Sequence, residues 1–185
     1  MRSAPTIALA SGRLFDLARL NVEDVTIEDI AQGLANTCRF GGQCRRFYSV
    51  AEHSVLSSAI VPREHAYAAL MHDCAEALIG DIPTPLKEIL PDYQRLEHQV
   101  EQALFARFKV PLRLHDEVQK LHNEVKRADL AMLVRELDTL FPGWQKDKWI
   151  HTLASPAPIA LRFDDPVTAR ASFLATYHIL KPQGA

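Results

Sequence analysis

Residues 66–81 form an apolar stretch that carries ionisable side chains where the buried face of a helix normally has none. The stretch is rich in alanine and contains no proline or glycine before Gly80, so it predicts a helix ending there in a left-handed residue. His72 and Glu76 are four positions apart and would share one helix face, while Asp73 is rotated by about 100°. Burying three such groups without partners costs several kcal/mol, and a bound divalent cation would offset that cost.

One adjacent His-Asp pair cannot hold an ion alone, so further ligands must come from other helices. Residues 49 to about 61 begin with a capping-box pattern and predict a helix that carries His53 in its second turn. Residues 114 to about 141 predict a long helix whose apolar side chains recur at steps of three and four, and Asp129 interrupts that stripe. Both side chains are therefore candidates to join the pair.

Two imidazoles and two carboxylates make up the resulting candidate set, namely His53, His72, Asp73 and Asp129. With positions left open for water, such a set suits one divalent transition metal: Mn²⁺, Fe²⁺, Co²⁺, Ni²⁺ or Zn²⁺. An ion of this kind lowers the pKa of bound water and polarises a phosphoryl oxygen. Glu76, one turn beyond His72, would be able to act on that water or on a leaving-group oxygen as a general acid or base.

The size and charge of the chain exclude several classes of protein. Its 185 residues are enough for a sizeable core, and we expect a single domain over residues 1–185. The net charge of −2 gives no overall attraction to a nucleic-acid polymer or an anionic membrane. No apolar run approaches the roughly 20 residues of a membrane helix. The cysteines lack metal-ribbon spacing and favour free thiols in a reducing compartment, so we expect a cytoplasmic protein.

The remaining elements are predicted to be helical, apart from a small hairpin near the start. Short β-prone pieces around a Ser-Gly pair predict this hairpin within residues 5–20. Cap residues and apolar periodicity predict further helices from Thr26 to about 37, from Asp92 to before 111, and from Asp165 to about 180. Residues 80–87 contain two prolines and predict a loop.

These motifs resemble a known enzyme family. The pattern of His53, the His72-Asp73 pair and Asp129 is similar to the H…HD…D signature of the HD-domain metal-dependent phosphohydrolases. The neighbouring segments resemble the compact 5′-deoxynucleotidase branch of that family, and they are also similar to its small viral dATP triphosphohydrolases. The resemblance spans about residues 11–141, and the segments that carry it are Tyr48–Ser54, Met71–Ala77, Gly80–Lys87 and Lys126–Asp129.

The resemblance implies an all-α fold, an HD-type helical bundle with its core at about residues 26–141, and a homo-oligomer that binds a small nucleotide. It also implies roles for single residues. Glu76 would be the catalytic acid or base, Asp81 would hold the sugar hydroxyl, and Arg39 would contact phosphate. Phe40 stands where the nucleotidases often carry tryptophan. Magnesium at the substrate phosphates is a further candidate cofactor.

Four more cations are candidates to bind phosphate: Arg45, Arg46, Lys87 and Lys126. Surface loops are often basic, so a solvated loop explains Arg45 and Arg46 equally well. If all these cations converge on the pocket they indicate a triphosphate substrate, and if they scatter they indicate a monophosphate. We slightly favour a dATP-like dNTP triphosphohydrolase. The alternatives are a dNMP 5′-nucleotidase and an HD module that senses a nucleotide without turnover.

Other histidines offer alternative sites. The pair His115-Asp116 lies in the first turn of its predicted helix, where the helix dipole explains an aspartate. His98 is predicted to face solvent. His122 shares a face with Asp129 and is a candidate ligand for a second metal. Two helical turns separate these residues by about 10.5 Å, however, whereas paired catalytic metals lie only about 3.5–4 Å apart. We therefore expect one metal.

Overall fold

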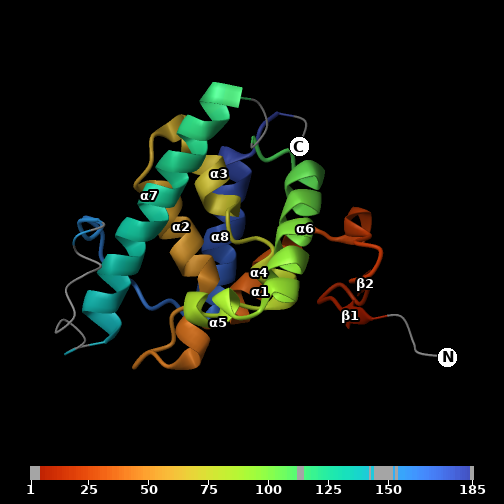
Figure 1. Cartoon of the computed structure of the whole chain (residues 1–185), viewed down its shortest axis with the longest axis horizontal. Helices are drawn as coiled ribbons and strands as arrows, with labels where there is room; N and C mark the ends of the chain where they lie inside the picture. The colour runs from red at the N-terminus through yellow and green to blue at the C-terminus, as the bar shows by residue number, and fades with distance from the viewer. Residues whose placement is uncertain (1–4, 112–114, 142, 144–151, 153, 184–185) are drawn as a thin grey trace.

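The chain folds into a bundle of helices with a small hairpin near its N-terminus (Figure 1). The hairpin pairs β1 (Thr6–Ala8) with β2 (Leu14–Asp16) in antiparallel register, with Ile7 opposite Phe15. Both predictions, the all-α fold and the small hairpin, are confirmed. This computed structural model describes residues 5–111, 115–141, 143, 152 and 154–183, and from residue 115 to residue 122 only the helical backbone.

The described helices have the following bounds: α1 (Ile27–Asn36), α2 (Val50–Ala59), α3 (Ala66–Met71), α4 (Glu76–Ile79), α5 (Thr84–Glu88), α6 (Pro91–Arg107), α7 (His115–Leu140) and α8 (Pro166–Leu180). Short 3₁₀ helices lie at η1 (Val22–Asp24), η2 (Phe40–Gly42) and η3 (Arg63–His65). None of the described helices is long and apolar enough to cross a membrane. The bounds of α1, α6, α7 and α8 agree with the predicted ranges to within a few residues.

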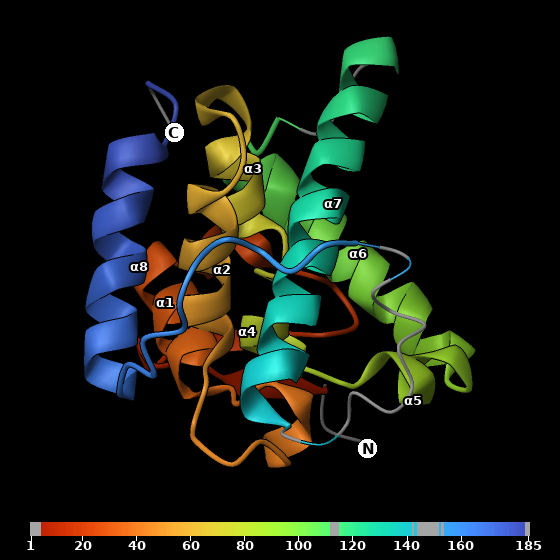
Figure 2. The ribbon, with the colours of Figure 1, turned by 90° about the vertical axis from the view of Figure 1, so that its left-hand side faces the viewer.

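Helix α2 is the centre of the bundle, because it packs against α1, α3, α7 and α8 (Figure 2). Helix α1 also packs against α8 and against the short α4. A Cβ atom on Gly33 of α1 would lie 2.4 Å from the carbonyl oxygen of Ala77, so only glycine permits this approach. The approach keeps α4, which carries Glu76, against the bundle.

Two apolar clusters stabilise this arrangement. The larger one joins the hairpin to α1, α2, α3, α6 and α8, and it includes Phe15, Leu70 and Phe173. The smaller one lies between α2, α7 and residues 157–163, and it includes Met132. The candidate metal ligand His53, on α2, is buried where α2 meets α7.

The predicted helix over residues 66–81 is interrupted. Helix α3 ends at Met71, residues 72–75 form a turn, and α4 begins at Glu76. The backbone N–H groups of Cys74 and Glu76 donate to residues three positions earlier, at 3.0 Å each, so the chain winds more tightly than an α-helix. Gly80 has the expected positive φ of 82°, but its ψ of 160° lies outside the left-handed helical region.

Two further expectations need correction. Ser49 caps α2 by accepting from the backbone N–H of Glu52, but the Glu52 carboxylate does not complete a capping box. It accepts instead from the backbone N–H groups of residues 162–164, which are three donors in place of the single one that a capping box uses. Residues 80–87 are not wholly a loop, because the helix α5 begins at Thr84; Pro85 lies in its first turn, where a missing N–H costs nothing.

Candidate metal centre and active site

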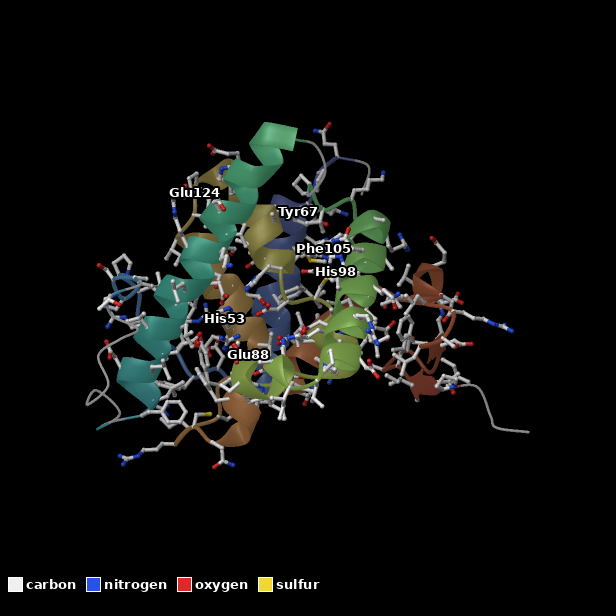
Figure 3. All side chains as sticks on the ribbon, viewed as in Figure 1. His53, Tyr67, Glu88, His98, Phe105 and Glu124 are labelled. Atoms are coloured by element: carbon white, nitrogen blue, oxygen red, sulfur yellow. The ribbon has the colours of Figure 1, made fainter. Side chains whose placement is uncertain are left out.

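Two helices and one turn bring the predicted metal ligands together. His53 lies in α2 and Asp129 lies on α7. His72 and Asp73 lie in the turn of residues 72–75 that follows α3. Since α3 and α7 both pack against α2, these distant parts of the sequence meet. His53 has no exposed surface and lies inside the bundle, between α2 and α7 (Figure 3).

The ligand atoms converge on one point. The Oδ1 atom of Asp129 lies 3.2 Å from His53 Nε2 and 3.8 Å from His72 Nε2. The Oδ2 atom of Asp73 lies 3.2 Å from His72 Nε2 and 3.6 Å from His53 Nε2. The two Nε2 atoms are 3.3 Å apart. One atom from each of His53, His72 and Asp129 lies within 4.8 Å of the other two, so a single small cation would be in reach of all three.

The hydrogen bonds of the two imidazoles suit metal binding. His72 Nδ1 donates to the backbone carbonyl of Ala69 at 2.7 Å, and His53 Nδ1 donates to the carboxylate of Glu136 at 2.6 Å. A neutral imidazole with its proton on Nδ1 presents a lone pair on Nε2, and both Nε2 atoms face the candidate centre. Nitrogen and carboxylate donors together suit a borderline divalent metal. The residues present therefore fit a resident metal ion.

Glu136, on α7, is a functional candidate that the sequence pattern did not single out. Its side chain has no exposed surface. Besides the contact with His53, its Oε2 accepts from Nε of Arg39 at 3.2 Å and lies 3.1 Å from Arg39 Nη2. A signal was present, because Glu136 follows Met132 by four residues and so continues the stripe that Asp129 interrupts. A second carboxylate in that stripe predicts a buried cation as partner.

The electrostatics of the centre favour positive charge. Burial acts to lower the pKa of His72, but the carboxylates of Asp73 and Asp129 outweigh it and raise that pKa to about 9. Burial and the Arg39 guanidinium likewise oppose the protonation of His53, yet Glu136 and Asp129 raise its pKa. A divalent cation would displace the protons from such imidazoles on binding.

Glu76 lies beside the candidate metal ligands, on a pocket of about 290 Å³ that His72, Asp73 and Lys87 also line. Its carboxylate is buried, and its Oε1 accepts from Lys87 Nζ at 3.4 Å. Burial raises the pKa of Glu76 well above its usual range, and the carboxylates of Asp73 and Asp81 raise it further, against the effect of nearby cations. A carboxyl group with a raised pKa is suited to proton transfer.

The loop of residues 39–42 has an unusual conformation that contacts hold in place. Phe40 has a φ of 58°, in the left-handed region that bulky residues rarely adopt. Its backbone N–H donates to Oδ2 of Asp81 at 3.1 Å. Its ring packs edge-on against Phe141 with the ring centroids 5.1 Å apart. In this structure Asp81 therefore fixes the loop that carries Phe40.

Two of the candidate cations are held by carboxylates next to the centre. Arg39, in addition to its contacts with Glu136, places Nη1 3.4 Å from Oδ2 of Asp73. The Nζ atom of Lys87 lies 2.5 Å from Oε1 of Glu97 and 3.4 Å from Oε1 of Glu76. Both cations are thus bound to acidic groups of the site and its rim.

The other three candidate cations are exposed and lie in two places. Lys126 is exposed and lines a second pocket of about 180 Å³ together with His72 and Asp129. Arg46 is exposed and its guanidinium carbon lies 3.8 Å from the ring centroid of Phe163. Arg45 is exposed in the same loop. Lys126 therefore joins Arg39 and Lys87 next to the centre, whereas Arg45 and Arg46 belong to an exposed loop.

The histidine alternatives add no metal site among the described residues. His98 has 69% of its side chain exposed and pairs with Glu101 at 3.5 Å, in agreement with its predicted position on the solvent side of α6 (Figure 3). It also lines the rim of the pocket beside Glu76. The side chains of His115, Asp116 and His122 lie outside the described residues.

Residues 43–141, more than half of the chain, match the model of a protein family described as 5′-deoxynucleotidase YfbR-like. The matched segment contains all four predicted metal ligands, together with Glu76 and Glu136.

Three relatives extend this comparison. The Escherichia coli protein YfdR is 44% identical over 126 residues, which cover 68% of this chain and 67% of YfdR. A Rhodobacter capsulatus protein is 32% identical over an alignment that covers 93% of each chain. Both are described as uncharacterized. A 5′-deoxynucleotidase of Vibrio cholerae is 28% identical over 97 residues, and this match covers 50% of this chain and 49% of the enzyme.

Proposed function

Because the chain belongs to the 5′-deoxynucleotidase YfbR-like family, we propose that it hydrolyses the 5′-phosphate of a 2′-deoxynucleoside monophosphate with a divalent metal as cofactor. Membership of this family supports the HD-type helical bundle and the phosphohydrolase family that the motifs predicted. The observation that carries the proposal is the convergence of His53, His72 and Asp129 within 4.8 Å, with Asp73 at their side. Such a cluster of two imidazoles and two carboxylates has the composition of a metal centre.

A monophosphate replaces the triphosphate that the sequence alone slightly favours. The family description and the Vibrio cholerae relative both name a 5′-deoxynucleotidase, which supports the monophosphate better. The contacts of two candidate cations support it too. Arg46 stacks on Phe163, and Lys87 pairs with Glu97, so both already have partners other than a phosphate. A single phosphate needs less positive charge than a triphosphate.

In this proposal His53, His72, Asp73 and Asp129 hold the metal ion. When bound, a divalent ion supplies Lewis acidity that lowers the pKa of water and stabilises charge on phosphoryl oxygens. Arg39 adds a fixed positive charge, because Glu136 and Asp73 hold its guanidinium next to the ligands. A charge that is already in position requires no reorganisation when the substrate arrives.

Glu76 moves the proton in this proposal. Water attacks the phosphorus atom, an O–P bond forms, and the bond between phosphorus and the 5′-oxygen of the sugar breaks. The departing oxygen takes up the proton of the Glu76 carboxyl, and the carboxylate recovers a proton from the attacking water. Burial raises the pKa of Glu76 well above its usual range, which favours the protonated carboxyl that this step needs. Lys87, at 3.4 Å from Glu76 Oε1, orients the carboxyl group.

Phe40 and Asp81 are proposed to recognise the sugar. Asp81 fixes Phe40 through its backbone N–H, so the position of the ring depends on that carboxylate. Asp81 also retains a second oxygen for a sugar hydroxyl. A site that pairs a buried carboxylate with a hydroxyl rejects analogues lacking it, because the carboxylate is then left without a partner.

The proposed function is tested by phosphate release from matched panels of dNMPs, NMPs and dNTPs in the presence of Mn²⁺, Co²⁺ or Mg²⁺. We expect inorganic phosphate from dNMPs, less from the ribonucleotides, and no triphosphate from dNTPs. Triphosphate release from dNTPs without turnover of dNMPs would restore the first expectation. Nucleotide binding without any turnover would indicate a sensing module instead.

A further inference from the structure

We propose that Glu136 is a positioning residue that holds one metal-ligating imidazole and the phosphate-facing guanidinium in a fixed relation. Through His53, Glu136 would affect metal binding. Through Arg39 it would affect phosphate binding, and this second part rests on the proposed function. Both partners contact the same carboxylate: Oε1 lies 2.6 Å from His53 Nδ1, and Oε2 lies 3.2 Å from Arg39 Nε. One side chain thus connects two parts of the site.

The burial of Glu136 indicates why both contacts are needed. The side chain has no exposed surface, so water cannot solvate its charge. A buried carboxylate without partners is strongly unfavourable, and hydrogen bonds to charged donors are the strongest available in proteins. The guanidinium contributes two nitrogens, Nε and Nη2, to a single oxygen of Glu136. Removal of either partner leaves a buried charge that the other partner satisfies only in part.

The contact with His53 determines which nitrogen faces the metal. A carboxylate at Nδ1 retains the proton there and leaves the lone pair on Nε2. The ring also becomes a stronger ligand, because the carboxylate stabilises positive charge that develops on the imidazole. His53 Nε2 is the atom that lies 3.2 Å from Oδ1 of Asp129. Glu136 therefore acts on metal affinity without touching the metal.

The contact with Arg39 connects Glu136 to Asp73, on the other side of the site. Arg39 comes from the loop before α2, and its Nη1 reaches Oδ2 of Asp73 at 3.4 Å. Glu136, Arg39 and Asp73 therefore form a chain of contacts that begins on α7 and ends at a metal ligand. A guanidinium held at both ends keeps its remaining N–H groups in one orientation, which suits recognition of a phosphate.

Glu136→Gln is the informative substitution, because an amide has one oxygen where the carboxylate has two. If that oxygen accepts from His53, the amide N–H₂ group faces the Arg39 guanidinium. Both groups are hydrogen-bond donors, so no hydrogen bond forms between them. If it accepts from Arg39, the N–H₂ group faces His53 Nδ1. We expect the Kd for Mn²⁺, measured by calorimetry without nucleotide, to rise by about 10–100-fold. The Kd for inorganic phosphate, measured on the metal-loaded protein, should rise with it.

Two matched variants separate positioning from simple burial. Glu52→Gln alters a second fully buried carboxylate, whose partners are backbone N–H groups of residues 162–164. It should leave the Kd for Mn²⁺ unchanged. Arg39→Lys retains the charge but not the fork, so it should weaken phosphate binding far more than Mn²⁺ binding. Wild-type affinity for Mn²⁺ in Glu136→Gln would overturn the proposal.

A measurement on the wild-type protein covers the case in which Glu136→Gln does not fold. Imidazole ¹⁵N spectra of the zinc-loaded protein should show His53 protonated at Nδ1 and ligated through Nε2. Ligation through Nδ1 would overturn the proposal. These tests need no substrate, so they stand apart from the proposed function: an enzyme that releases no phosphate from dNMPs contradicts that function, whereas unchanged metal affinity contradicts the role of Glu136.

Discussion

Glu52 and Glu136 are both carboxylates with no exposed surface, yet they have opposite kinds of partner. Glu52 accepts from three backbone N–H groups of residues 162–164, at distances between 2.6 and 3.0 Å. Glu136 contacts the side chains of His53 and Arg39. The difference separates two regions of the molecule, because one carboxylate anchors a chain segment while the other lies behind the proposed active site.

Each kind of partner predicts a different consequence of mutation. Backbone donors belong to the fold, so the loss of Glu52 should lower stability and leave the site chemistry intact. Side-chain donors belong to the site, so the loss of Glu136 or of the ligands in front of it should change metal and substrate binding.

The largest effect is expected at the proposed metal ligands. Asp129→Ala should abolish both bound metal and phosphate release, because it removes an oxygen that lies within 3.2 Å of His53 Nε2. Helicity should be retained, since Asp129 is partly exposed and contributes little to the apolar core. Elemental analysis, circular dichroism and the phosphate assay measure the three quantities.

Glu124→Ala is the matched control on the same helix. Glu124 pairs with Arg127 at the surface, 2.7 Å apart, and exposed pairs of this kind contribute only about 0–1 kcal/mol. The control should keep its metal and its activity. Wild-type metal content in Asp129→Ala would remove Asp129 from the centre.

The next effect concerns proton transfer by Glu76. Glu76→Gln retains size and most hydrogen bonding but removes the exchangeable proton. We expect kcat to fall by about 10²–10⁴-fold, while metal content and nucleotide Kd persist. If Glu76 only orients Lys87, the substitution should weaken nucleotide binding and leave the saturating kcat close to the wild-type value. Glu88→Gln, on the exposed surface of α5, is the control.

A smaller effect is expected on the structural side of the comparison. Glu52→Gln exchanges an acceptor for a donor, so at least one backbone N–H of residues 162–164 loses its partner. We expect the free energy of unfolding to fall by about 1–3 kcal/mol, as measured by urea denaturation at fixed metal concentration. A variant of normal stability with weakened Mn²⁺ binding would break the division between the two carboxylates.

The smallest effect concerns Asp29, a third buried carboxylate, at the start of α1. Burial acts to raise its pKa, but hydrogen bonds from Thr26 and from the backbone of Ser11 lower it below the usual 3.8. A lowered folded-state pKa contributes stability that is fully present above 3.8 and is lost as the pH falls through the folded-state value.

Asp29→Asn should therefore lower the free energy of unfolding by about 1 kcal/mol at pH 7. The difference in the free energy of unfolding between wild type and variant should shrink as the pH falls below the usual pKa of 3.8. Urea denaturation of both proteins over a pH series measures this difference in the free energy of unfolding. A difference that stays constant down to acidic pH would show that the Asp29 charge does not stabilise α1.

Local signals explain which parts of the fold were predictable from the sequence. The capping box of Thr26 and Asp29 and the cap of Asp165 before Pro166 involve residues close in the chain, and α1 and α8 begin where they predict. His53 and Asp129 were identifiable as candidate ligands because a charged or polar group on the buried side of a helix requires a partner. The single domain, the homo-oligomer and the cytoplasmic location stay predictions.

What the sequence did not predict depends on contacts between distant residues. Glu136 contacts Arg39 across 97 positions of the chain, and Glu52 contacts Arg162 across 110. No periodic pattern specifies which partner a buried carboxylate will have. The tight turn at residues 72–75 was missed for a related reason, since the composition of that stretch favours a helix and only tertiary packing selects the turn.

The metal centre is tested most directly by anomalous diffraction from crystals of the protein loaded with Mn²⁺. We expect one anomalous peak per chain, coordinated by Nε2 of His53, Nε2 of His72 and the carboxylates of Asp73 and Asp129. The carboxylate of Glu136 should remain hydrogen-bonded to His53 Nδ1. The absence of a peak at this position, or a peak held by other side chains, would contradict the assignment of these four residues as the ligands.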